Sequence, residues 1–269
     1  MMRAKLLYVT FLAWACVPAG VAQNKPTYVT HNCVKAAPGQ LNAISALLPE
    51  MSRFLQVRVD DGSMSFFVAL RAAIPAGSSA RCDYILAYGY EGYPPEPLTR
   101  AQQEANFKKS GVAGSYDEFI ARRDRAMTLV SNDLLRVVAN GMVGSGSAVG
   151  GYVRLNLNKM KPGHTVAEWG KFETEGWGAY VASVAKERPG FGWRAEALVS
   201  PAGLSLDYNA VTVDILPNWA ATGGGWGGAQ VWNKVHADMT MGDYIAKLWG
   251  MVDRYKVELY RVAAVVAKK

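Results

Sequence analysis

Histidine and cysteine are scarce in this chain, and their scarcity argues against several classes of chemistry. The 269 residues include three histidines and three cysteines. The histidines lie far apart and form no HExxH pair, and no serine or cysteine lies in a nucleophile-elbow pattern. A zinc site usually needs at least three protein ligands. The sequence therefore predicts no metal site and gives no support for a zinc enzyme or a serine or cysteine hydrolase.

Long apolar segments and runs of like charge are also missing. The net charge is +7, and it falls by two if Arg3 and Lys5 are removed with a leader. No basic stripe accompanies this charge, so we expect no nucleic-acid partner. The apolar run Leu6–Ala15 breaks at Pro18 and Gly20, short of the roughly 20 residues that span a bilayer. We expect no integral membrane segment after signal cleavage, and the sequence leaves the oligomeric state open.

The N-terminus has the pattern of a cleavable signal peptide. A basic start and an apolar run are followed by the small residues Gly20 and Ala22 before Gln23. We assign residues 1–22 to a signal peptide and expect a periplasmic or secreted protein. Lipidation at Cys16 is an alternative, although the three residues before it lack the aliphatic side chain usual in a lipobox.

Export would permit a disulfide between the two remaining cysteines. Cys33 and Cys82 are both retained after cleavage, and an oxidising compartment favours their pairing. The sequence does not show whether their geometry allows the bond.

The chain contains two copies of one pattern. Residues 28–39 and 152–163 share the pattern YVxxNxxKxxPG at an offset of 124. An Asp-Tyr pair recurs at the same offset, and Phe119 matches Tyr244 at an offset of 125. Collinear matches at a near-constant offset indicate duplication. We divide the chain into a first unit (23–143), a Gly/Ser linker (144–151) and a second unit (152–269).

Each unit is predicted to run strand, helix, strand, strand, helix, strand. The opening strand of the second unit alternates apolar and polar residues, and the next segment has helical periodicity. Each second helical region contains a capping box, which begins at Ser115 and at Thr240. The predicted hairpins pair 66–74 with 82–90 and 192–200 with 205–216, and the last strands are 134–143 and 257–267.

This order predicts an α+β fold built from ferredoxin-like βαββαβ units. A sheet with helices on one face leaves its other face bare, and two such sheets can cover each other. We therefore expect the two tandem units to pack sheet to sheet as a pseudo-dimeric α/β barrel.

The layout resembles the dimeric α/β-barrel superfamily in its tandem, single-chain form. The likeness is carried by Glu173 and Trp177 on the first helix of the second unit, by 190–193, and by Asp207 and Tyr208. The second half resembles secreted bacterial members with no assigned activity. The superfamily includes cofactor-free monooxygenases, haem enzymes, small-ligand binders and stress proteins, so the resemblance does not select one activity. It implies cofactor-free oxidative chemistry as one function, with no cofactor expected and haem not excluded.

His31 and Cys33 mark a difference between the two units. In the repeat alignment they replace Leu155 and Leu157 on the apolar face of the opening strand. His31 is therefore a candidate ligand or proton-transfer residue in a cleft between sheet and helices. The competing interpretation is a buried, hydrogen-bonded histidine beside a small apolar cysteine.

All tryptophans that follow the predicted signal peptide lie in the second half, which suggests an aromatic pocket there. They are Trp169, Trp177, Trp193, Trp219, Trp226, Trp232 and Trp249. Glu173 lies four residues before Trp177, and His236 lies four after Trp232, so each is a candidate acid or base beside an aromatic wall. An ordinary aromatic core is the competing interpretation.

The candidate ligand-binding residues are Glu173, Trp177, Trp193, Tyr208, His236 and His31. The sequence thus predicts an exported protein that binds a small hydrophobic or aromatic molecule, and the alternative is a non-catalytic scaffold for a protein partner. Catalysis is left undecided, and no catalytic residue is assigned.

Overall fold

The computed structural model describes residues 25–140, 147–201, 206–224 and 226–268. The predicted signal peptide, Cys16 and part of the predicted linker lie outside these ranges. The strands are β1 (Thr27–Ala36), β2 (Phe66–Ile74), β3 (Tyr84–Glu91), β4 (Met127–Asn140), β5 (Tyr152–Met160), β6 (Gly192–Ser200), β7 (Ala210–Leu216) and β8 (Val252–Ala267). The helices are α1 (Leu41–Asp60), α2 (Arg100–Lys109), α3 (Tyr116–Ala126), α4 (Val166–Glu173), α5 (Ala179–Glu187), α6 (Gly228–Val235) and α7 (Met241–Met251). A π-helical turn, Thr174–Gly178, joins α4 to α5, and short 3₁₀ turns cover Gly77–Ser79 and Ala220–Gly223.

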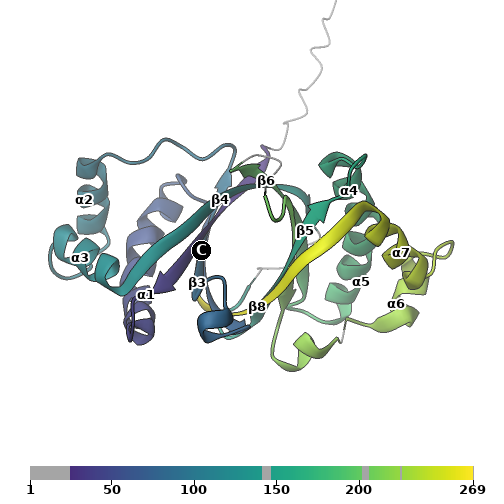
Figure 1. The fold of residues 1–269 in the computed structure, drawn as a ribbon. Coiled ribbons are helices and arrows are strands. Elements are labelled where there is room, and N and C mark those ends of the chain that lie inside the picture. The colour runs from purple at the N-terminus through teal and green to yellow at the C-terminus, as the bar shows by residue number, and fades with distance from the viewer. Residues whose placement is uncertain (1–24, 141–146, 202–205, 225, 269) are drawn as a thin grey trace, which may run out of the picture.

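The strands form one closed antiparallel barrel in the order β1-β3-β2-β8-β5-β7-β6-β4. Within each half the strands follow the same spatial order: the fourth lies beside the first, then come the third and the second. Two antiparallel ladders, β2 with β8 and β4 with β6, join the halves. Figure 1 shows the barrel at the centre, with α1, α2 and α3 on one side and α4 to α7 on the other.

Three apolar cores follow from this arrangement. One lies between the sheet of the first half and α1, α2 and α3, and it includes Leu48 and Phe67. A second, rich in tryptophan and tyrosine, lies between the sheet of the second half and its helices. The third fills the barrel, where Val153 and Leu155 meet residues of the first half. Alternation along each strand sends successive side chains into the barrel and toward the helices.

The predicted hairpins are present as β2 with β3 and β6 with β7. Ser115 and Glu118 form a complete capping box, while Thr240 caps α7 by accepting from the Asp243 amide. The last strands begin earlier than predicted, at Met127 and Val252. Most side chains at the start of each of these strands are exposed, so this part of the sequence lacks the alternation of a half-buried strand. Strand β7 begins at Ala210 rather than at 205.

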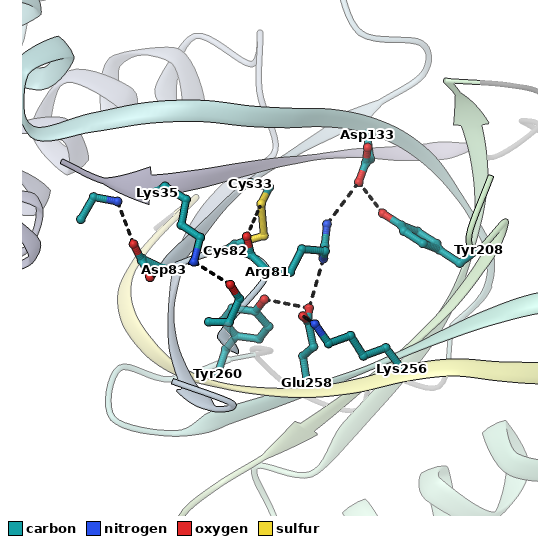
Figure 2. Close-up of a disulfide and its surroundings, with 12 residues drawn as sticks. Cys33, Lys35, Arg81, Cys82, Asp83, Asp133, Tyr208, Lys256, Glu258 and Tyr260 are labelled. Carbon is teal, nitrogen blue, oxygen red and sulfur yellow. Dashed lines mark hydrogen bonds and ion pairs between the residues drawn. A yellow bond between two sulfur atoms is a disulfide. The ribbon is translucent and has the colours of Figure 1, made fainter. Parts of the chain in front are cut away.

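A buried polar network links the two halves inside the barrel (Figure 2). Arg81 Nε lies 3.3 Å from Glu258 Oε2, and Arg81 Nη1 lies 3.8 Å from Asp133 Oδ2. Tyr208 donates a hydrogen bond to Asp133, and Tyr260 donates one to Glu258 at 2.9 Å. Because Arg81 and Asp133 belong to the first half and their partners Glu258 and Tyr208 to the second, this network fixes how the halves are aligned.

A disulfide joins β1 to the segment before β3. Cys33 and Cys82 are bonded and almost fully buried. Figure 2 shows the bond beside Arg81. The disulfide therefore restrains the segment that contains Arg81, the residue that forms the ion pairs of the interior network.

Arg81→Met should destabilise the protein strongly, because it removes the cationic partner of buried Asp133 and leaves buried Glu258 with Lys256 as its remaining cation, 3.1 Å away. Removing one member of a buried ion pair typically costs about 3 to 5 kcal/mol. Urea unfolding at pH 7 measures the loss. The exposed Arg100, which pairs with Glu104 and Asp117, provides the control in Arg100→Met. Equal losses in the two variants would contradict the importance of the interior network.

Candidate functional site

A cavity of about 180 Å³ lies between the sheet of the second half and its helices. Strands β5, β6, β7 and β8 supply one wall, and the helical segment after Glu173 and helix α7 supply the other. Alternation along β5 directs Arg154 and Asn156 toward the cavity while Val153 and Leu155 point into the barrel. The lining residues are Arg154, Asn156, Glu173, Trp177, Trp193, Thr212, Asp214, Trp226, Tyr244, Ile245, Leu248, Trp249 and Arg254.

Glu173 is the buried acid of this cavity. Its exposed fraction is 2 %, and its Oε2 accepts a hydrogen bond of 2.9 Å from the Tyr244 hydroxyl. Burial raises the pKa of Glu173 to about 7, and the hydrogen bond from Tyr244 opposes this rise. A carboxyl group with a pKa near 7 can both donate and accept a proton at neutral pH.

The π-helical turn directly after Glu173 brings two elements close together. At Gly176 a Cβ atom would lie 2.2 Å from Cε2 of Tyr244, so only glycine allows this approach. The Gly176 carbonyl oxygen also lies 3.0 Å from His236 Nε2. Such turns are frequent at functional sites. Here the turn allows the Tyr244 ring to pack against the helix that carries Glu173.

A second carboxyl group, Asp214, faces the cavity from β7. Its exposed fraction is 6 %, and burial raises its pKa. Asn156 donates to Asp214 at 3.2 Å, and Arg154 Nη1 lies 3.9 Å from Asp214 Oδ2. Burial therefore raises the pKa of Asp214, and the nearby Arg154 cation lowers it.

Two further groups favour a ligand that carries hydrogen-bond acceptors. The Arg254 guanidinium lies 4.6 Å from the centre of the Trp249 ring, and burial lowers its pKa. The indole Nε1 of Trp193 is buried and has no hydrogen-bond partner among the described residues. A buried donor without a partner costs free energy, so an acceptor on a ligand at this position would be favoured.

The structure brings together three of the six predicted ligand-binding residues. Glu173, Trp177 and Trp193 line the cavity, and ligand binding by them stays a prediction. His236 lies outside the cavity lining and packs against Trp232, with ring centres 4.3 Å apart and ring planes tilted by 40°.

His31 and Tyr208 lie inside the barrel instead. His31 shares a strand face with Val29 and Cys33, the face turned away from the helices, so it does not lie in a cleft between sheet and helices. Its Nε2 is 3.4 Å from Glu196 Oε2, and burial lowers its pKa against the opposing charge of Glu196.

Sequence reasoning missed Tyr244, Asp214 and Arg254. Comparison of the two repeats could have identified two of them, Tyr244 and Arg254. Tyr244 stands opposite Phe119, and at the same offset Arg254 stands opposite Leu129. In both pairs a polar or charged residue of the second half replaces an apolar one, and both members line a cavity.

The cavity lining does not fit a haem. None of the three histidines lines it, and a cavity of about 180 Å³ is close to the roughly 150 Å³ that holds a benzene ring. A porphyrin is several times larger. Among the described residues, no group of three or more histidine, cysteine, aspartate or glutamate side chains is arranged to hold a metal ion. No helix in the described ranges is long and apolar enough to cross a membrane.

Glu173→Gln should change the pH dependence of stability. The folded protein binds the Glu173 proton more tightly than the unfolded chain, since the pKa rises from 4.5 to about 7. This contribution favours the folded state below pH 4.5 and is lost as the pH rises through 7, a loss of about 3 kcal/mol. The free energy of unfolding of wild type minus that of the variant should therefore fall by that amount between pH 4 and pH 8. Glu175→Gln, at an exposed neighbouring position, is the control, and a flat difference for Glu173→Gln would contradict the raised pKa.

Comparisons with known proteins identify the fold but no closer relationship. No protein-family model matches the sequence, and no curated protein matches it. A solved structure from Lactobacillus acidophilus, provisionally named a monooxygenase, has a TM-score of 0.50 and 8 % identity over 91 % of this chain and 97 % of its own.

Two weaker matches cover similar shares of the chain. A haem-binding protein from Thermus thermophilus has a TM-score of 0.47 and 8 % identity over 88 % of this chain and 91 % of its own. An anthrone oxidase-like protein has a TM-score of 0.44 and 12 % identity over 90 % of this chain and 93 % of its own. Strand order, helix placement and the Lactobacillus acidophilus match agree with the resemblance seen in the sequence: the chain has the fold of the dimeric α/β-barrel superfamily.

Proposed function

We propose that this chain is an exported small-molecule-binding protein whose second half holds a one-ring aromatic compound bearing an acceptor group, such as an aromatic carboxylate. The observation that carries the proposal is the juxtaposition in one cavity of Glu173, the unpartnered Trp193 indole and two arginines. The volume of about 180 Å³ suits a single substituted ring. Aromatic walls with a few convergent polar groups are typical of small-molecule sites.

Proton transfer at Glu173 is the chemistry that the cavity supports best. A carboxyl group with a pKa near 7 can remove a proton from a bound acidic group and return it. Because the Lactobacillus acidophilus structure is provisionally named a monooxygenase, oxidation of the bound molecule is the reaction class to test. Trp193, Trp226 and Tyr244, which line the cavity with Glu173, are buried, which favours a ligand over a scaffold role for this region.

We also infer that the two halves are copies of one ferredoxin-like unit. The repeated offsets in the sequence and the common spatial order of strands in the two halves both support this origin.

Trp177→Ala should weaken binding of benzoate, our probe for an aromatic carboxylate, by at least about tenfold because it removes an aromatic wall. Tryptophan fluorescence and calorimetry measure the change. Trp219→Ala, at a 54 % exposed position, is the matched control and should bind as wild type does. Native mass spectrometry of protein from its own host would identify the natural ligand. Undiminished binding by a folded Trp177→Ala variant would rule out this placement.

The exported mature protein should begin at Gln23 and contain an oxidised Cys33–Cys82 pair. An oxidising compartment is where such a buried bond forms and persists. Mass spectrometry of the N-terminal peptide and of the non-reduced disulfide peptide from fractionated cells tests both points. A retained N-terminus in the cytosolic fraction contradicts export, and a lipid-modified Cys16 would replace the cleavage site proposed here.

A further inference from the structure

The first half contains a cavity of its own, larger than that of the second half. Its volume is about 260 Å³, and it lies between the sheet of the first half and helices α1 and α3. Most of its wall is apolar, with Phe54, Phe119 and Leu86 among the lining residues. The rings of Phe54 and Phe119 meet edge to face, with centres 5.9 Å apart.

The two cavities occupy matching places on the outer, helix-covered faces of the two halves of the sheet. Asn32 is paired with Leu86 across one ladder, as Asn156 is paired with Thr212 across another. Two residues further along, Tyr88 takes the place of Asp214. The matching lining residues are Asn32 and Asn156, Leu86 and Thr212, Tyr88 and Asp214, Phe119 and Tyr244, Arg123 and Leu248, and Leu129 and Arg254.

The matched positions differ in chemistry. In the first half, leucine, tyrosine and phenylalanine replace threonine, aspartate and tyrosine, so the wall carries no buried carboxyl group. The cation that remains, Arg123, is neutralised by Asp124, with Nη2 2.7 Å from Oδ1. The first cavity therefore disfavours a charged ligand, whereas the second contains Arg254 in addition to the Arg154–Asp214 pair.

One polar atom in the first cavity has no partner. Asn32 Oδ1 is buried and accepts no hydrogen bond from any described residue. In its counterpart in the second half, Asn156, the side-chain amide nitrogen donates to Thr212 Oγ1 and to Asp214 Oδ2. An unpaired buried acceptor is costly, and a donor on a bound molecule would relieve that cost.

From these observations we propose that the first half binds a second, different small molecule: an uncharged two-ring aromatic compound whose hydroxyl group donates to Asn32. A cavity of about 260 Å³ exceeds the roughly 150 Å³ that holds a benzene ring by enough to admit a fused second ring. This site goes beyond the function proposed for the second half and does not depend on it. The barrel is then a two-ligand protein rather than one working half supported by an inert one.

Methionine methyl groups provide a readout that separates the two cavities. Met51 and Met127 line the first cavity, while Met160, Met241 and Met251 pack in the core of the second half. We expect 2-naphthol, titrated into the full mature protein with ¹³C-methyl-labelled methionine, to shift the Met51 and Met127 signals. The second group should not move. Benzoate should leave Met51 and Met127 in place whether or not it binds in the second half.

Asn32→Leu tests the role of the donor. Wild type should prefer 2-naphthol to naphthalene by about three- to tenfold, the range expected for one neutral hydrogen bond, and the variant should lose this preference while still binding naphthalene. Since Leu86 packs in the same wall, Leu86→Trp should fill the cavity and abolish binding of both compounds. Shifts confined to the second methionine group, an unchanged preference in Asn32→Leu, or no binding of 2-naphthol at about 1 mM, a concentration that detects even weak complexes, would each overturn the proposal.

Discussion

Mutual burial of the inner faces of two half-sheets is the constraint on which the structure depends. Each half covers the outer face of its sheet with its own helices but has no element for the inner face. The apolar residues on those inner faces can leave water only by meeting each other, which they do in the barrel core. A polar network then gives this otherwise non-directional contact a defined alignment, because its partners belong to different halves.

Filling the barrel interior has consequences for where ligands can bind. Side chains from both halves occupy the space between the sheets, so the cavities lie on the outer faces, under the helices. His31 is buried in that interior and paired with Glu196, which accounts for the polar residue that the repeat alignment singled out. The two cavities proposed to bind ligands lie instead on the opposite face of the equivalent strands, where Asn32 and Asn156 line them.

Much of the fold was predictable from the sequence because local rules and the repeat agree. Alternation identified the strand that begins at Tyr152, the hairpins follow from their turn residues, and the Ser115 cap is formed as its sequence pattern predicts. The early starts of the strands at Met127 and Val252 were missed, since most side chains there are exposed and do not alternate between buried and exposed positions.

The site was harder to predict, because it depends on contacts between distant segments. Glu173 and Trp177 were identified from one helix. Their partners Asp214 and Arg254 come from β7 and β8, and only the closed sheet brings them near. The π-helical turn was not anticipated either, and its Gly176 packs closely against Tyr244, 68 positions later in the chain, a contact that no local pattern reveals.

Closure of the strand ring also limits how this protein can meet other macromolecules. In an open sheet, the two outermost strands present unpaired amide and carbonyl groups to which a further strand can add. Here β2 pairs with β8 and β4 with β6, so each of the strands in the described part of the chain has a neighbour on both sides. Association through this barrel must therefore use helix surfaces and loops, and side-chain complementarity rather than backbone pairing will decide its partners.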